Sequence, residues 1–107
     1  LGVVLDPHIV ESQMISGVIY GLSAAIHGEI TFADGVVEQE NFYDYDALRM
    51  HNAPKFEVRL LENNPFIGGA GEPSTPPSMP ALGNALFDLT GNRARELPLK
   101  KTFSLIL

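Results

Sequence analysis

The chain has 107 residues, of which 45% are hydrophobic and 19% are charged, and it contains no cysteine and no tryptophan. A chain of this length forms one modest domain and cannot enclose a large cofactor on all sides. Thirteen acidic residues against seven basic ones give a formal net charge of −6. Because affinity for nucleic acid depends on Lys and Arg that neutralise phosphates, this balance argues against a nucleic-acid partner. The absence of cysteine excludes a disulfide scaffold, an iron–sulfur ligand set and a cysteine nucleophile within these residues.

Two further properties concern how the chain is organised. No apolar run approaches the roughly 20 residues that a membrane-spanning helix needs. The first residue is Leu1 rather than Met, and no composition shift divides the chain. We therefore expect a single domain over residues 1–107 that is a fragment or processed piece of a longer protein.

The first predicted element is a long helix that covers about residues 12–27. Apolar residues recur there at three- and four-residue spacing, which places them on one stripe of a helix. Asp6 and Pro7 are typical of a helix entry, with Asp as the N-cap and Pro at the first helical position. Gly28 is placed where a left-handed residue would end the helix.

Strands are predicted in the middle of the chain. Residues 29–41 predict a β-hairpin, because Asp34 and Gly35 are a strong tight-turn pair between two short alternating stretches. Residues 41–52 show no periodicity and are expected to be irregular. Residues 55–62 alternate again, with Phe56, Val58 and Leu60 on one side, and predict a further strand.

A proline- and glycine-rich loop and a second helix complete the predicted fold. Residues 63–80 contain five prolines and three glycines, which argues against a long helix or a central strand. Residues 81–90 predict a helix that stops at Gly91. Since helices and strands are segregated along the chain rather than alternating, the predicted fold class is α+β.

The loop Gly68-Gly69-Ala70-Gly71-Glu72-Pro73 is the first candidate for chemistry. Its glycines allow the backbone to approach a ligand closely, and the nearby prolines restrict the loop, so that Glu72 would be held in place. A positioned carboxylate is what a general base requires. An ordinary rigid surface loop with a solvated acid explains the same residues, and composition alone favours that alternative.

One face of the first helix is the second candidate. Gln13, Gly17 and Gly21 lie four residues apart, so they share a face that is shallow beside an amide side chain. Such a face admits a ligand or a second backbone, and close packing of the helix on a sheet is the alternative that the residues alone favour. The three histidines have no short ligand spacing, so no metal site is predicted.

Motifs in a fixed order along residues 3–98 resemble those of a known family. They are Asp6-Pro7, Gln13, Gly17, Gly28-Glu29-Ile30, Asn41-Phe42, Asp44-Tyr45, Leu48-Arg49-Met50, the glycine loop, Pro76-Pro77, Pro80-Ala81, Asn84-Ala85-Leu86 and Thr90-Gly91. Together they resemble the C-terminal part of the molybdopterin-binding large subunit of the xanthine dehydrogenase and aldehyde oxidase family. Within that family the chain is most similar to the isoquinoline 1-oxidoreductase beta subunit type.

This resemblance implies that the chain is the C-terminal fragment of a molybdenum hydroxylase or dehydrogenase. Such enzymes oxidise N-heterocycles or aldehydes and use water as the oxygen source. In the family, the glutamate of the Gly-Glu-Pro element is the active-site base, which implies that role for Glu72. Gln13 and the loop backbone at Gly69, Ala70 and Gly71 would contact the cofactor. The chain departs from the family at Ile15-Ser16, where a Glu-Gly pair is common.

The resemblance also implies a cofactor and partners. The cofactor would be molybdenum-molybdopterin, in the cytosine dinucleotide form, bound by the full-length protein and not by the fragment, which we expect to be inactive alone. The implied partners are the remainder of the large subunit, a small iron–sulfur subunit and the substrate, and the fragment could also self-associate. The resemblance is to a bacterial type of protein, and it is equally compatible with a location in the cytoplasm and in the periplasm. The alternative function is a non-catalytic binding or assembly module derived from the same fold.

Overall fold

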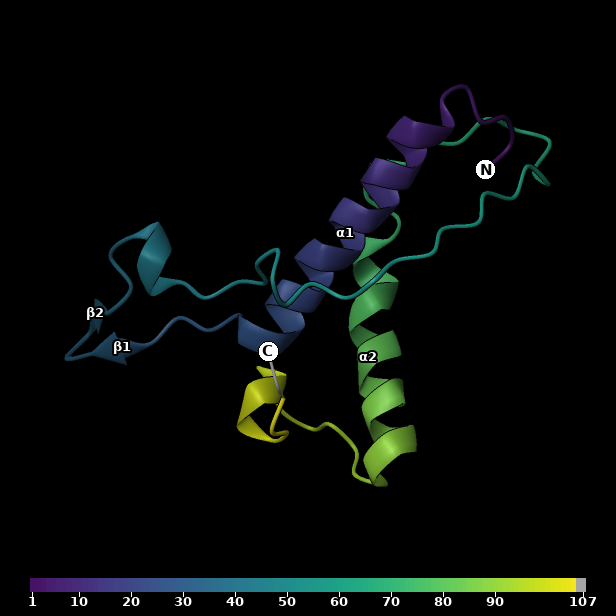
Figure 1. Ribbon diagram of the computed structural model, residues 1–107. Coiled ribbons are helices and arrows are strands. Elements are labelled where there is room, and N and C mark those ends of the chain that lie inside the picture. The colour runs from purple at the N-terminus through teal and green to yellow at the C-terminus, as the bar shows by residue number, and fades with distance from the viewer. Residues whose placement is uncertain (106–107) are drawn as a thin grey trace.

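Two long helices dominate the structure. The computed structural model of the protein describes residues 1–105, so the last two residues of the expected 1–107 domain lie outside the described part. Helix α1 covers Pro7–His27 and helix α2 covers Thr75–Thr90, and Figure 1 shows the two packed side by side. The smaller elements are the strands β1, Phe32–Ala33, and β2, Val36–Val37, and the 3₁₀ helices η1, Phe42–Asp44, and η2, Leu99–Lys101. Two helices with a small antiparallel sheet confirm the α+β class.

Helix α1 begins as predicted but ends differently. The Asp6 side chain accepts a hydrogen bond from the Ile9 backbone N–H at 3.1 Å, and Pro7 is the first helical residue. At the other end, the Gly28 N–H donates to the Ala24 carbonyl at 3.1 Å. Gly28 has φ −57° and ψ 101°, so the predicted left-handed stop is wrong. The chain does not turn back here but leaves in an extended direction towards β1.

The composition of α1 also corrects a second expectation. By length and composition alone, α1 could cross a membrane: its 18-residue window has a mean hydropathy of 1.3, and 22% of that window is buried. The expectation that no such segment exists rests on the absence of a long uninterrupted apolar run. A mean over a window can be high even when the window includes polar residues such as Ser12 and Gln13. Core helices of water-soluble proteins have the same properties, and α1 packs on α2 and η2.

The predicted hairpin is present but short. Strand β1 pairs antiparallel with β2, with Phe32 opposite Val37 and Ala33 opposite Val36. Asp34 and Gly35 turn the chain with φ values of 51° and 81°, as the tight-turn pair requires. All four strand residues are exposed. The hairpin therefore lacks the packing against a core that would stabilise a longer pair of strands.

The predicted strand at residues 55–62 is not formed within the described part of the chain. The expected alternation of exposure is present, since Phe56, Val58 and Leu60 are half-buried and their polar neighbours are exposed. A strand, however, also requires a partner backbone to complete its hydrogen bonds. No described segment supplies one, so the segment is extended but unpaired.

Helix α2 begins six residues earlier than predicted. Pro76 and Pro77 occupy its first turn, where the backbone N–H groups have no helical partner in any case. Pro80 lies inside the helix and removes one further hydrogen bond. The expectation that the proline-rich stretch excludes helix is therefore wrong from Thr75 onwards. The stop at Gly91 is confirmed, with φ 74° and its N–H donating to the Phe87 carbonyl at 2.7 Å.

The core lies where the C-terminal end of α1 meets α2 and η2, and it is small. Its buried residues are Ala25, Leu86, Leu99 and Phe103. The chain exposes 8035 Å², whereas a monomeric protein of 11.6 kDa exposes about 5,800 Å². Its radius of gyration is 16.6 Å, against about 13 Å for a compact domain of this length. The fold is therefore extended, with roughly 2,200 Å² more exposed surface than a free-standing domain of its mass.

Candidate active site

Close packing of α1 on the first turn of α2 positions the loop that carries Glu72. Gly17 and Gly21 are buried on α1. A Cβ atom at Gly21 would stand 2.6 Å from the Thr75 carbonyl oxygen, and one at Gly17 would overlap the Ser74 hydroxyl. Only glycine leaves room for this approach. At these two positions the shallow face of α1 therefore serves close packing, although against helix α2 and not against the sheet that the sequence suggested.

A cavity of about 430 Å³ lies between α1 and the glycine loop. Glu72 lines this cavity and is exposed to solvent. The Glu72 backbone carbonyl accepts a hydrogen bond from the Thr75 N–H at 3.0 Å, and this bond fixes the backbone of Glu72 directly ahead of α2. The lining residues are Ser16, Gly17 and Tyr20 of α1, Gly71 and Glu72 of the loop, and Thr75 and Pro76 of α2.

Gln13 lies beside the same loop. A Cβ atom at Gly71 would stand 3.9 Å from the Gln13 side-chain nitrogen Nε2, so the amide and the loop are neighbours. Gly69 has no heavy atom within 4 Å of the position that a Cβ would take, and Ala70 is half-buried. The structure thus brings Gln13 and Gly71 together next to Glu72. It places Gly69 where the loop is open.

On α1, sequence reasoning missed two residues of the cavity, Ser16 and Tyr20. With 3.6 residues per turn, positions 13, 16, 17 and 20 fall within about 100° of one helix face. Tyr20 is 72% exposed, so its ring is available to a bound molecule. The signal that could have found both residues is their helical spacing from Gln13.

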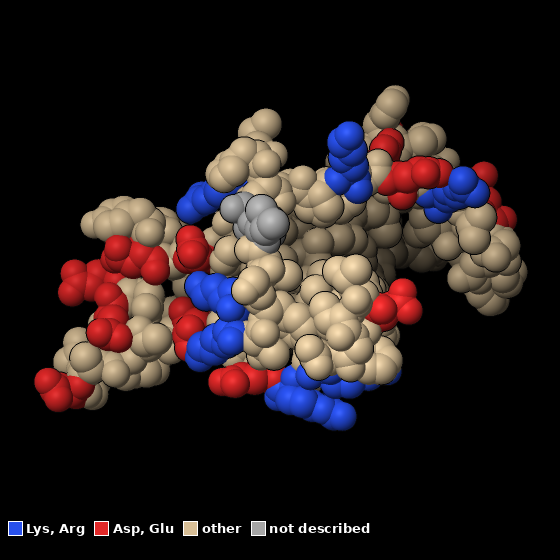
Figure 2. All heavy atoms as spheres, turned by 60° about the horizontal axis from the view of Figure 1, so that its bottom comes forward, with Lys and Arg blue, Asp and Glu red and all other residues tan. Residues whose placement is uncertain are grey.

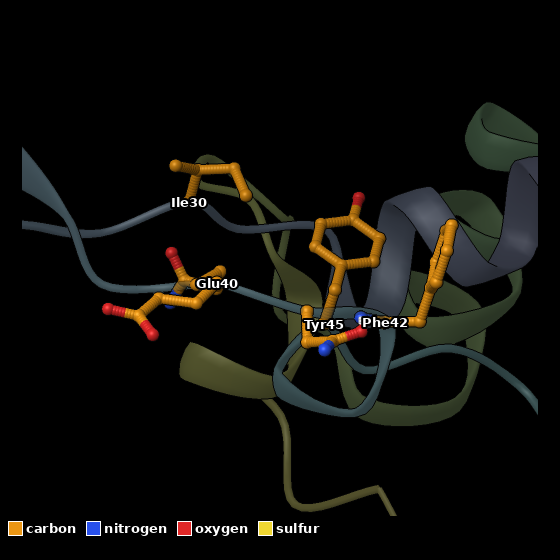
Figure 3. Close-up of a pocket in the computed structure, with 6 residues that line it drawn as sticks. Ile30, Glu40, Phe42 and Tyr45 are labelled. Carbon is orange, nitrogen blue, oxygen red and sulfur yellow. Dashed lines mark hydrogen bonds between the residues drawn. The ribbon is translucent and has the colours of Figure 1, made fainter.

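A second hollow, of about 400 Å³, shares no residue with the Glu72 cavity. Figure 3 shows the rings of Phe42 and Tyr45 beside it, while the carboxylate of Glu40 points away from both rings. Phe42 is 93% exposed. This hollow is open apolar surface and contains no arrangement suited to proton transfer.

The lobe around this second hollow is strongly acidic. Residues 29–46 include six acidic residues and no Lys or Arg, and Figure 2 shows the acidic side chains gathered on this side of the molecule. Where the lobe meets the helices, the Asp46 carboxylate lies 3.7 Å from both the His27 Nδ1 and the Lys100 Nζ. The hydrogen bond from Lys101 to Glu29 raises the pKa of Lys101. Within residues 1–105, no group of three or more His, Asp or Glu side chains could hold a metal ion.

Comparison with known proteins shows what the chain as a whole is similar to. No family model and no solved structure matches the chain significantly. It is 39% identical, over 94% of its length, to the beta subunit of isoquinoline 1-oxidoreductase from Brevundimonas diminuta, of which it covers 13%. It is 32% identical over 92% to a nicotinate dehydrogenase subunit from Pseudomonas putida, covering 8%. It is 28% identical over 92% to the aldehyde oxidoreductase molybdenum-binding subunit PaoC from Escherichia coli, covering 14%.

These relatives define a class of protein, the molybdenum-binding subunits of larger oxidoreductases. The chain is similar to molybdenum-binding subunits of the xanthine dehydrogenase and aldehyde oxidase family, among them the isoquinoline 1-oxidoreductase beta subunit, which confirms the resemblance found in the sequence. The chain spans only 8–14% of the length of these relatives.

Proposed function

We propose that the chain is the C-terminal segment of the catalytic subunit of a molybdenum-dependent oxidoreductase, with Glu72 as its active-site base. The observation that carries this proposal is that Glu72 and Gly71 line one cavity and that the Gln13 amide lies beside Gly71. The relatives named above act, by their names, on isoquinoline, nicotinate and aldehydes. Accordingly, we propose N-heterocycles or aldehydes as the substrates and water as the source of the added oxygen.

We propose that residues of this chain would form one edge of the site for a molybdopterin, in the cytosine dinucleotide form, in the full-length subunit. The exposed Gln13 amide offers both a hydrogen-bond donor and an acceptor. The open loop around Gly69 leaves its backbone accessible to a ligand, so the backbone groups of Gly69, Ala70 and Gly71 would contact the cofactor. When bound, the molybdenum centre supplies the two-electron oxidation.

In this proposal, Glu72 acts as the proton acceptor. A general base must stand within hydrogen-bond reach of the group that loses its proton. The hydrogen bond between the Glu72 carbonyl and the Thr75 N–H, together with Pro73, fixes the backbone from which the carboxylate projects. The adjacent cavity, of about 430 Å³, has the size of a small-molecule site. A substrate bound in this cavity would lie next to the Glu72 carboxylate.

The remaining parts of the enzyme come from outside these residues. Other segments of the large subunit would supply the remaining walls of the cofactor site. A separate small iron–sulfur subunit would take up the electrons, because this chain has no cysteine to hold a cluster. We expect the isolated 107 residues to bind no molybdenum and to turn over no substrate. Metal analysis and oxidation assays check this, and stoichiometric molybdenum with turnover would contradict it.

The test of the proposed base is Glu72→Gln in the full-length subunit together with its partner. Because a positioned general base contributes about 10²- to 10⁴-fold to a rate, kcat for heterocycle or aldehyde oxidation should fall by that factor, while molybdenum and pterin content stay unchanged. Asp88→Asn is the matched control, since Asp88 is an exposed acid on α2 that does not line the cavity. Full activity in Glu72→Gln would instead favour the non-catalytic binding or assembly module.

A further inference from the structure

Residues 55–60 have the side-chain pattern of a β-strand. Phe56, Val58 and Leu60 are half-buried, whereas Lys55, Glu57 and Arg59 are exposed. Alternation with a period of two is the geometry of a strand that packs one face on a core. On the outer face, the Arg59 guanidinium donates to the Glu57 carboxylate at 2.9 and 3.1 Å. The segment therefore already has a half-buried apolar face and a polar face on which Glu57 and Arg59 pair with each other.

The backbone of this segment is unpaired in the described structure. Before it, the Ala53 N–H donates to the Arg49 carbonyl at 2.9 Å, and after it, the Asn64 N–H donates to the Leu1 carbonyl at 3.3 Å. Between these two points, residues 55–61 make no backbone hydrogen bond to any described residue. Figure 1 shows them as a long extended trace with no arrow beside it. Proteins pair or cover such edges, because free N–H and C=O groups are a template for another strand.

We propose that residues 55–61 are a β-strand in the full-length subunit, hydrogen-bonded to a strand from the remaining polypeptide of that same subunit. This inference rests on the proposal that the chain is a segment of a longer subunit. The chain spans 8–14% of its relatives, so proteins of this kind contain abundant further polypeptide. The excess exposed surface of roughly 2,200 Å² is more than twice the ~800 Å² that each partner buries in a standard interface.

A second copy of the chain is the less suitable partner. Each copy has a formal net charge of −6, and like charges of this size oppose association. Beside the Glu57–Arg59 pair, Lys55 leaves the outer face with one net positive charge, which is small against the charge of −6 on each copy. The partner strand would instead be held by main-chain hydrogen bonds and by the half-buried apolar face, as in other cases of strand addition.

Docking of this strand would also restrain the loop that carries Glu72. Only residues 62–67 separate the segment from Gly68, and the Glu62 carboxylate already accepts a hydrogen bond from the Val4 N–H at 2.7 Å. On its other side, the loop is fixed by α2 through the bond between the Glu72 carbonyl and the Thr75 N–H. The docked strand would therefore hold the loop from its N-terminal side. The remaining polypeptide would position the proposed base without touching it.

Amide hydrogen exchange of the full-length subunit, read at single-residue resolution, tests this inference. We expect alternate amides of residues 55–61 to exchange at least 100-fold more slowly than an unstructured peptide, because a strand paired on one edge protects every second N–H. Protection of all seven amides would mean pairing on both edges and would also support the proposal. Exchange of all seven at the unprotected rate would overturn it. Protection that disappears when the subunit is diluted to a monomer would overturn the proposed partner, because it would identify a second copy.

Proline substitutions with matched alanine controls add a second readout. Glu57→Pro and Val58→Pro remove N–H groups that point to opposite edges of the strand, whereas Glu57→Ala and Val58→Ala shorten the same side chains and keep the N–H. At least one proline variant should lower the Tm of the full-length subunit and abolish the protection of its neighbours, relative to its alanine control. The proposal would be contradicted if each proline variant had the same Tm and the same amide protection as its alanine control. Amide exchange does not depend on catalysis. A negative exchange result would therefore overturn the proposed strand without bearing on Glu72, and a negative Glu72→Gln result would overturn the proposed base without bearing on the strand.

Discussion

The contact between α1 and α2 makes a prediction in which two glycine-to-alanine substitutions have opposite effects. Both Gly21 and Gly83 lie inside helices, where alanine is favoured over glycine by about 1 kcal/mol. At Gly83 no heavy atom lies within 4 Å of the position of a new Cβ. At Gly21 the new Cβ would stand 2.6 Å from the Thr75 carbonyl oxygen, which belongs to the backbone of α2 and cannot rotate away. Gly83→Ala should therefore stabilise the fold, and Gly21→Ala should push the helices apart.

The expected magnitude follows from the difference between the two variants. Overpacking of a tight contact costs about 1–3 kcal/mol, and because the helix-propensity gain is common to both, that cost is their expected difference in unfolding free energy. For a domain of this size it corresponds to a Tm difference of at least about 4–8 °C. Gly17→Ala should cost less than Gly21→Ala, because its nearest neighbour is the Ser74 side chain, which can rotate.

Urea denaturation of the 107-residue chain, followed by far-ultraviolet circular dichroism, measures these differences directly. The expected order of stability is Gly83→Ala above the unsubstituted chain, followed by Gly17→Ala and then Gly21→Ala. Stabilisation by Gly21→Ala equal to that by Gly83→Ala would refute the reasoning. Such a result would mean that α1 does not lie on the first turn of α2. The position of the Glu72 loop against α1 would then lose its basis.

Two other predictions concern the cofactor contact and the ion pair at the base of the acidic lobe. Gln13→Leu keeps the size of the side chain and removes its amide, so the full-length subunit should retain less molybdenum per polypeptide, and undiminished retention would exclude the contact. The hydrogen bond to Glu29 raises the pKa of Lys101 above 10.5, so this pair stabilises the fold fully below that pH and is lost as the pH rises through the raised pKa. Glu29→Gln should therefore lower the Tm at pH 8, and this loss should shrink as the pH rises beyond 10.5; a loss of equal size at every pH would argue against the pair.

The features that could be predicted from the sequence are those that local residues determine. Asp6 and Pro7 start α1 because the cap and the first turn involve neighbouring residues only. Asp34 and Gly35 turn the chain because their backbone conformation is a local property, and Gly91 ends α2 for the same reason. The start of α2 was missed because prolines were treated as helix breakers throughout, although the first turn tolerates them at positions 76 and 77.

Features that depend on distant partners could not be predicted in the same way. The alternation at Phe56, Val58 and Leu60 shows which side of the segment is buried, but it carries no information about which backbone pairs with it. The motif order led to Glu72, which lines the cavity, and to Gln13, which lies beside Gly71 of the same loop. Tyr20 was missed, because no motif contains it and only the packing of α1 against the loop brings it to the cavity.

The most direct test of the central claim is the single-turnover rate of substrate oxidation by the full-length subunit carrying Glu72→Gln, loaded with molybdenum to the level of the unsubstituted protein. Single-turnover kinetics separate the chemical step from substrate binding and product release. If Glu72 is the base, the rate of the chemical step falls by about 10²- to 10⁴-fold while substrate affinity is retained. An unchanged single-turnover rate at equal molybdenum content would show that Glu72 is not the base.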